Sequence, residues 1–224
     1  LLARSMTFAE AEALMPGILA VNAADAGQLH HLQAASLKRL GTTPVPLEGI
    51  GTAQFHVFRS ADGNDDHLAI ELGERPSQLA APMNHQNVPL VRLHSACLTG
   101  DIFHSKKCDC GPQLNSAMEA MSQNGHGILL YLAQEGRSIG LTNKLRAYLL
   151  QDAGLDTVDA NRALGYSDDE REYEIAAAML RGIGCDPVRP MTNNPNNIAA
   201  LERVGINVVE QVPLIVGLSQ ENIE

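Results

Sequence analysis

The sequence predicts an α/β protein with a mixed, largely parallel sheet, flanking helices and an antiparallel β portion near the N-terminus. From Cys110 onward, helix-like segments alternate with short apolar strands, a layout typical of parallel sheets with crossover helices. Residues 52–58 and 67–72 alternate apolar and polar side chains on either side of the turn cluster 60–65, which indicates a hairpin. Hydrophobic residues make up 45% of the 224 residues, so a substantial core can be buried.

Three parts are expected along the chain. Residues 1–45 are expected to form a helical extension, because a Thr7–Glu10 capping box opens a short helix and residues 23–40 place leucines at helical spacing. Residues 46–216 carry the α/β pattern, and residues 217–224 are interpreted as an incomplete C-terminal tail. The chain does not begin with Met, so it is interpreted as a piece of a longer polypeptide.

Caps and chain breakers bound the expected elements of the α/β part. Gly125 and Gly154 are typical of the position after a helix end. Residues 167–170 have the sequence SDDE, a capping box, and Pro195 suits a first helical turn. In order, the expected elements are a strand at 88–93, a helix at 111–124, a strand at 127–132, helices at 138–151 and 167–181, a strand at 188–191, a helix from 194 and a strand at 206–212.

Composition narrows the partners and the compartment. The formal net charge of -10 argues against a nucleic-acid-binding surface. The sequence has no run of about 18 apolar residues, so we expect no membrane span, and no secretory signal is visible. Three of the four cysteines are clustered, which fits a reducing cytoplasm better than a disulfide framework.

The strongest candidate site is the cluster of Cys97, Cys108 and Cys110. Cys108 and Cys110 are two residues apart, so both side chains point the same way in an extended chain. Three thiolates can bind zinc and leave a fourth tetrahedral position open, which is typical of a catalytic rather than a structural site. The alternative is three buried thiols without a ligand. Cys185 stands apart and is expected to pack in the core.

Three polar segments follow expected strands or open expected helices. Glu135–Arg137 follows a buried strand, where helix N–H groups and an arginine favour an anion. Asp168–Arg171 offers a carboxylate for proton transfer beside an arginine suited to phosphate. Thr192–Asn197 offers a hydroxyl, amides and free N–H groups. Each has a plain alternative: a turn with a solvated arginine, carboxylates that complement a helix dipole, and ordinary helix capping.

Taken together, these segments resemble the GTP cyclohydrolase II family, which catalyses the first committed step of riboflavin biosynthesis. The resemblance covers roughly residues 50–214, and its motifs occur in family order. The matching segments are VRLHSACLTGDIFHSKKCDCG (Val91–Gly111), GILLYLAQEGRSIGLTNKLRAYLLQDAGLDTVDANRALGYSDDEREY (Gly127–Tyr173), MTNNPNN (Met191–Asn197) and GINVVEQVPL (Gly205–Leu214).

The resemblance implies zinc-dependent hydrolysis of GTP. Cys97, Cys108 and Cys110 would hold a catalytic zinc whose bound water attacks C8 of the guanine ring, and a second hydrolysis would release formate. Arg171 matches the family's nucleophile on the α-phosphate, which expels pyrophosphate, and Asp169 matches the proton acceptor. The remaining product would be 2,5-diamino-6-ribosylamino-4(3H)-pyrimidinone 5′-phosphate.

The resemblance also implies the substrate contacts, a second metal and the assembly. Mg²⁺ would accompany the triphosphate, Tyr148 matches a tyrosine near the base, and the family is homodimeric. The residues that match substrate-binding positions are Arg92, Leu93, His94, Ser95, Ala96, Gln113, Glu135, Gly136, Arg137, Tyr148, Thr157, Thr192 and Asn197.

This chain departs from the family pattern at two substrate positions. Ala96 replaces the usual glutamate of the HSEC motif, and Asn197 stands where a lysine usually touches the phosphates. A lost charge-assisted contact costs roughly 1.5–3 kcal/mol if it is buried. Two alternatives therefore stay open: a paralogue that acts on another purine nucleotide or stops at a partial product, and a catalytically weak nucleotide-binding subunit.

Overall fold

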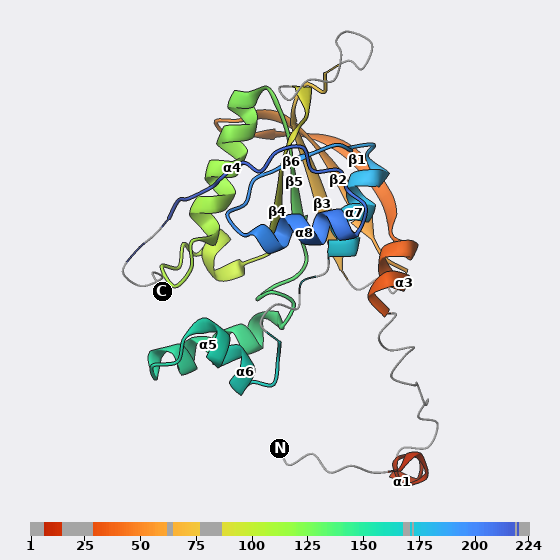
Figure 1. Cartoon of the computed structure of the whole chain (residues 1–224), viewed down its shortest axis with the longest axis vertical. Coiled ribbons are helices and arrows are strands. Elements are labelled where there is room, and N and C mark those ends of the chain that lie inside the picture. The colour runs from red at the N-terminus through yellow and green to blue at the C-terminus, as the bar shows by residue number, and fades with distance from the viewer. Residues whose placement is uncertain are drawn as a thin grey trace.

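The computed structural model describes residues 7–14, 29–61, 65–76, 87–167, 171, 173–217 and 219. Within them, six strands form one sheet in the order β1-β2-β3-β5-β4-β6 (Figure 1). The strands are β1 (Lys38–Leu47), β2 (Gly51–Arg59), β3 (Asp66–Gly73), β4 (Leu90–Ser95), β5 (His126–Leu132) and β6 (Arg189–Pro190).

The sheet is mixed. The pairs β1–β2, β2–β3 and β3–β5 are antiparallel, whereas β5–β4 and β4–β6 are parallel. The expected hairpin is confirmed, with Phe58 opposite His67. The mixed α/β class with an antiparallel portion is therefore confirmed. The expectation of a largely parallel sheet is wrong, because β1 extends the antiparallel hairpin on one side and β5 on the other, so that three of the five strand pairings are antiparallel.

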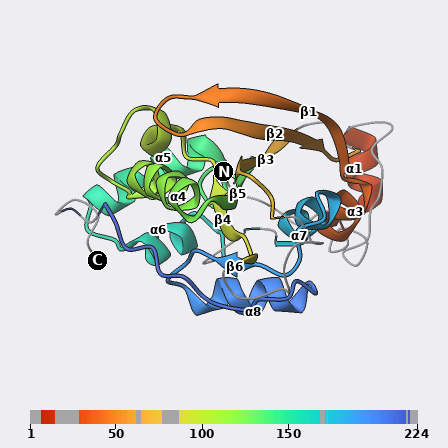
Figure 2. The same ribbon diagram turned by 90° about the horizontal axis from the view of Figure 1, so that it is seen from above.

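Helices cover both faces of the sheet (Figures 1 and 2). On one face, α4 (Cys110–Asn124) packs Ala117 and Met121 against Leu129 of β5. On the other face, Met179 and Leu180 of α7 pack in a core cluster with buried strand residues, and α3 and α8 contribute to the same cluster. These helices are α3 (Leu29–Ser36), α7 (Tyr173–Gly182) and α8 (Pro195–Arg203).

Two further helices lie beyond the carboxyl ends of the parallel strands (Figure 1). They are α5 (Gly140–Asp152) and α6 (Thr157–Ala163). The short α1 (Phe8–Leu14) begins with the expected capping box, in which the Thr7 N–H donates to Glu10 and the Glu10 N–H donates to the Thr7 hydroxyl. Among the residues that the structure describes, none of the helices combines the length and apolar character that a bilayer crossing needs.

Several expected boundaries are wrong. The helix expected at 23–40 ends at Ser36, and residues 38–47 form β1, so residues 38–45 belong to the sheet and β1 crosses the boundary expected between 45 and 46. The capping box expected at 167–170 falls mostly outside the described residues, and α7 begins only at Tyr173, after Arg171. The strand expected at 206–212 is reduced to two isolated bridges, and α6 was not expected.

Candidate functional site

The parallel strands bring the polar segments together at one edge of the sheet. β4 is parallel to both β5 and β6, so the residues that follow the three strands meet at their carboxyl ends, where ligands of open α/β sheets usually bind. Cys97 follows β4, Glu135–Arg137 follows β5, and Thr192 follows β6. The convergence of these segments gives the site its shape.

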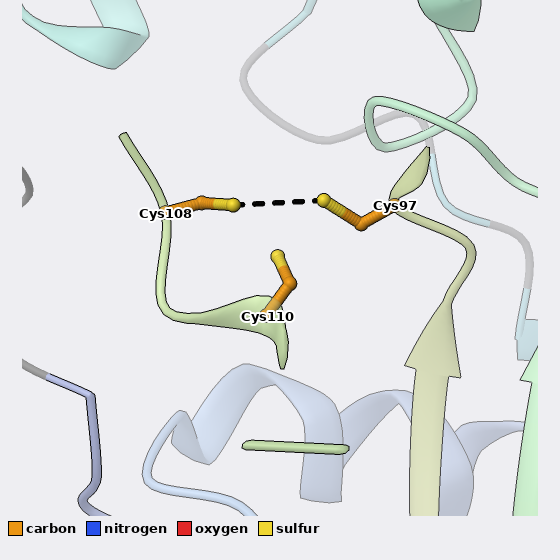
Figure 3. Close-up of side chains that lie close together, drawn as sticks. All are labelled: Cys97, Cys108 and Cys110. Atoms are coloured by element: carbon orange, nitrogen blue, oxygen red, sulfur yellow. Dashed lines mark hydrogen bonds between the residues drawn. The ribbon is translucent and has the colours of Figure 1, made fainter. Parts of the chain in front are cut away.

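The three clustered thiols face one another (Figure 3). Their Sγ atoms all lie within 4.8 Å of one another, and the Sγ atoms of Cys97 and Cys108 are 3.6 Å apart. Tetrahedral zinc with Zn–S bonds of about 2.3 Å places two sulfur ligands about 3.8 Å apart. The donor set of Cys97, Cys108 and Cys110 therefore fits zinc and provides three protein ligands, the number typical of a catalytic site.

The cysteine side chains leave no room for a Cβ atom at Gly100. Cys97 is followed by a short π-helix, η2 (Leu98–Ile102), in which the Gly100 N–H donates to the Cys97 Sγ at 3.3 Å. A Cβ atom at Gly100 would lie 2.8 Å from the Cys108 Sγ and 3.0 Å from the Cys97 Sγ. Glycine at this position therefore permits the thiols to converge.

A buried lysine contacts the thiol cluster. Lys144 of α5 donates through its Nζ to the Cys97 Sγ and to Glu135 Oε1, both at 2.8 Å. Hydrogen bonds from Cys108 and Cys110, followed by Lys144, hold the pKa of Cys97 far below its ordinary value. Burial opposes the charge of Lys144, but the contacts with Cys97 and Glu135 outweigh it and raise the pKa of Lys144. The Lys144 contact keeps a positive charge beside a thiolate.

A buried carboxylate orients the backbone of the first thiol residue. Asp101 accepts hydrogen bonds from the Cys97 N–H at 3.1 Å and the Tyr131 hydroxyl at 2.9 Å. His94 Nε2 lies 3.0 Å from the same carboxylate, and the His94 and Tyr131 rings stack. Burial, followed by the Asp101 carboxylate, raises the pKa of Tyr131. His94 thus supports Asp101, which binds the Cys97 backbone, and it also lines the pocket.

The thiols open into a pocket of about 610 Å³, a volume within the range of small-molecule sites. The structure brings most of the predicted site residues together in its wall. The lining includes Arg92, Leu93, His94, Ser95, Ala96, Cys97, Cys108, Cys110, Gln113, Gly136, Arg137, Tyr148, Thr157, Arg171, Thr192 and Asn197. Glu135 does not line the pocket, and Asp169 lies outside the described residues.

Several cationic side chains line the same pocket as the thiols. Arg92 donates to the Met191 carbonyl at 2.7 Å and to Gln113 Oε1 at 2.5 Å, while its buried Nε has no partner among the described residues. Burial, followed by the charge of Arg171, lowers the pKa of Arg92. Like charges held together in one pocket favour an anionic ligand that would relieve their repulsion.

The loop after β5 has an unusual backbone. Gly136, Arg137 and Ser138 have φ values of 63°, 57° and 75°, a left-handed run that two of these residues, being non-glycine, adopt at a cost. The turn is closed by hydrogen bonds from the Ser138 N–H to the Gln134 carbonyl at 3.2 Å and from the Gly140 N–H to the Glu135 carbonyl at 2.9 Å. Such strain is typical of functional sites.

The segment after β6 is held by its own hydrogen bonds. The Asn194 side chain caps α8 by accepting from the Asn196 N–H at 2.9 Å, so ordinary capping is confirmed there. Asn197 donates to the Thr192 hydroxyl at 2.9 Å and accepts from the Tyr173 hydroxyl at 2.7 Å. Asn197 stands where the family usually has a lysine, and its amide is hydrogen-bonded within the protein.

Sequence reasoning missed Lys144 and Asp101. Their partners Glu135, Tyr131 and His94 come from other elements, so the contacts cannot be read from the local sequence. The one available signal was helical spacing, since Lys144 shares a helix face with Ala147 and Tyr148.

Fold and site together define an α/β protein in which three clustered cysteines could hold a metal ion, beside a pocket lined in part by arginine and lysine side chains at the carboxyl ends of its parallel strands. A comparison of the sequence with models of protein families identifies the family. The chain belongs to the GTP cyclohydrolase II family, whose family model matches residues 38–213. The resemblance drawn from the sequence motifs is thereby confirmed.

Two of three similar curated relatives are GTP cyclohydrolase-2 proteins, and the third is a riboflavin biosynthesis protein. The chain is 48% identical to the GTP cyclohydrolase-2 of Azospirillum brasilense over 88% of this chain and 49% of the relative. It is 47% identical to the riboflavin biosynthesis protein RibBA of Bacillus velezensis over 77% of this chain and 42% of the relative. It is 48% identical to the GTP cyclohydrolase-2 of Neisseria meningitidis serogroup A over 77% of this chain and 83% of the relative.

The relatives differ in length. This chain spans about half the length of the first two and most of the third. A crystal structure of RibBX, a two-domain 3,4-dihydroxy-2-butanone 4-phosphate synthase from A. baumannii, is similar with a TM-score of 0.44 and 18% identity over 85% of this chain and 44% of that chain. That likeness is too weak to bear on fold or function.

Proposed function

We propose that this chain hydrolyses GTP in a zinc-dependent reaction, opening the imidazole ring and releasing formate and pyrophosphate. The observation that carries the proposal is the presence of two chemistries in one pocket. Cys97, Cys108 and Cys110 offer a metal centre, and Arg92, Arg137 and Arg171 offer positive charge to a triphosphate. Membership of the family and the names of the relatives support the same substrate.

The cysteines would hold zinc. When bound, zinc would lower the pKa of a water molecule, so that this water could act as the nucleophile at C8 of guanine at neutral pH. The protein groups around it then have separate tasks. Asp101 orients the backbone of Cys97 by accepting its N–H. Tyr148, whose hydroxyl lies 3.5 Å from the Thr99 hydroxyl, offers its ring to the base beside the thiols.

The phosphate chemistry would occur in the same pocket. We assign Arg171 to attack on the α-phosphorus with loss of pyrophosphate, after which water would cleave the new N–P bond to free the 5′-phosphate, and Asp169 to accept a proton, as in the family pattern. Mg²⁺ would accompany the triphosphate, since it binds phosphate oxygens and few protein groups. The product left after loss of formate and pyrophosphate is 2,5-diamino-6-ribosylamino-4(3H)-pyrimidinone 5′-phosphate, an early compound of riboflavin biosynthesis. We further propose a cytoplasmic homodimer that has no nucleic-acid partner.

Product analysis tests the proposal directly. Purified protein should contain about one zinc ion per chain, and incubation with GTP and Mg²⁺ should release formate and pyrophosphate in equal amounts. Replacing Cys108 with Ser should remove the metal and formate release together, because it removes one of three ligands. Zinc-replete protein that yields neither product would refute the proposal. Mass measurement in solution tests the dimer separately.

One alternative has an observation of its own. Ala96 and Asn197 stand where the family usually has a glutamate and a lysine, and the Asn197 amide is already bonded to Thr192 and Tyr173. A paralogue that acts on another purine nucleotide, or that stops at a partial product, would explain both replacements. Formate release from GTP compared with GMP and ATP at equal concentrations separates the two: a preference for GTP supports the main proposal.

A further inference from the structure

Lys144 of α5 is a buried charged residue. Only 9% of the residue is exposed, and burying an ammonium group is costly unless it is paired and hydrogen-bonded. Its Nζ lies 2.8 Å from the Cys97 Sγ and 2.8 Å from Glu135 Oε1, and 6.0 Å from the centre of the Tyr148 ring. Within the described residues, its hydrogen-bond partners are thus one thiol of the cluster and the carboxylate that follows β5.

Glu135 completes a bridge between two parts of the site. Its Oε1 accepts from Lys144, and its Oε2 accepts from the Leu98 N–H at 2.7 Å. Both carboxylate oxygens are therefore used inside the protein, which agrees with the absence of Glu135 from the pocket lining. Glu135 directly precedes the left-handed run at Gly136–Ser138 that presents Arg137 to the pocket.

The contacts form one continuous chain. It runs from the Cys97 Sγ through the Lys144 ammonium to the Glu135 carboxylate, and from there along the backbone to Arg137. A second path returns from Glu135 to Leu98, the residue next to Cys97. The thiol cluster and the anion-facing loop are thereby held by the same ion pair.

We propose that Lys144 is a positioning residue: it fixes the Cys97 thiolate relative to the Glu135 carboxylate and so couples the metal ligand to the loop that carries Arg137. The inference rests on the metal site of the proposed function, and it assigns Glu135 to the internal bridge rather than to direct side-chain contact with substrate. A hydrogen bond from an outer group to a metal ligand orients that ligand and tunes its donor strength.

Co²⁺ as the probe ion gives a readout independent of activity. Lys144→Met should weaken Co²⁺ binding by roughly 10-fold or more. It should also shift the sulfur-to-cobalt charge-transfer band to longer wavelength, because the Cys97 sulfur loses the N–H donor that stabilises its lone pairs. Lys144→Arg keeps a charged donor and should restore the band towards its wild-type position. Arg146→Met is the matched control, because Arg146 is exposed on the same helix and does not line the pocket.

The loop side of the bridge is tested with substrate. Glu135→Gln should raise the KM for GTP, because the loop loses the ion pair that anchors it. The double variant Lys144→Met/Glu135→Gln should raise the KM no more than the larger single effect, since residues that act as one unit are non-additive. Circular dichroism verifies that each variant is folded, and Glu135→Gln provides the test if Lys144→Met is not.

The outcomes separate this inference from the proposed function. Wild-type protein that binds no Co²⁺ and releases no formate would overturn both. Wild-type protein that does both, together with a Lys144→Met variant whose affinity and charge-transfer band are unchanged, would overturn the bridge alone. Independent, additive effects of Lys144→Met and Glu135→Gln on KM would also overturn it.

Discussion

Gly100→Ala tests whether the close approach of Gly100 to the thiols determines the positions of the three sulfur atoms. Gly100 has no positive φ value, so alanine is compatible with its backbone, and the effect of the change is steric. The added Cβ would lie 2.8 Å from the Cys108 Sγ and 3.0 Å from the Cys97 Sγ, whereas ordinary contacts begin at 3.4 Å. The sulfurs would therefore have to move by about 0.6 and 0.4 Å, more than the roughly 0.2 Å that metal–ligand distances tolerate.

The magnitude follows from the strain. Overpacking of a filled site costs typically about 1–3 kcal/mol, and 1.4 kcal/mol corresponds to a factor of about ten in an equilibrium constant. If the strain falls on the thiol arrangement, zinc affinity should drop by roughly 5- to 150-fold. We expect formate release at limiting zinc to fall by a similar factor, and excess zinc to restore part of it.

The assay is chelator competition for zinc, with formate release measured in parallel. Gly41→Ala is the matched control, because no atom lies within 4 Å of a Cβ at that position and its φ is also not positive. It should keep wild-type zinc affinity. A Gly100→Ala protein with wild-type affinity and activity would show that the thiols adapt freely, and the argument from close packing would be refuted.

Three other variants test substrate binding, the loss of stability at acid pH and the packing of the core. Asn197→Lys should lower the KM for GTP about tenfold or more, in a salt-sensitive way, by adding a charge-assisted phosphate contact; an unchanged KM would place the triphosphate elsewhere. Glu71 has its pKa lowered to about 2, since hydrogen bonds from His126, Arg75 and His56 outweigh its burial; the stability that it contributes is present above about pH 4.5, the unfolded value, and is lost as the pH falls towards 2. The free energy of unfolding of Glu71→Gln should not show this loss at acid pH. If it falls with pH as in the wild type, Glu71 is not the group responsible. Leu180→Ala should lower the free energy of unfolding by about 2–5 kcal/mol in urea titration, because Leu180 is fully buried; a loss below 1 kcal/mol would mean that the core collapses around the gap.

The chemistry-bearing segments could be predicted because they are local. Cys108 and Cys110 are two residues apart, and the Glu135–Arg137 and Thr192 segments follow apolar strands whose ends meet in any parallel sheet. The contacts of Lys144 with Cys97 and Glu135 could not be predicted, because they depend on how α5 packs against the residues after β4. No pattern in the sequence pairs Lys144 with Cys97, which lies 47 residues earlier.

The errors in the fold also have physical reasons. β1 is exposed along most of its length, so it lacks the alternation by which a half-buried strand is recognised. Leucines at helical spacing in residues 29–40 extended the expected helix into it. The SDDE segment satisfied the capping pattern, but α7 begins at Tyr173, where apolar residues start to pack against the sheet.

β1 also determines how one side of the molecule can meet other chains. It is the outermost strand on its side of the sheet, and it carries two prolines, Pro44 and Pro46, in alternate positions. Proline has no N–H to donate, and it is tolerated in a sheet mainly where that position faces away from a neighbouring strand. A foreign strand laid along this rim would therefore find two gaps in the ladder that it needs. Strand-by-strand growth into fibrils is thus disfavoured on this side, because a strand added there would lack two of its hydrogen bonds.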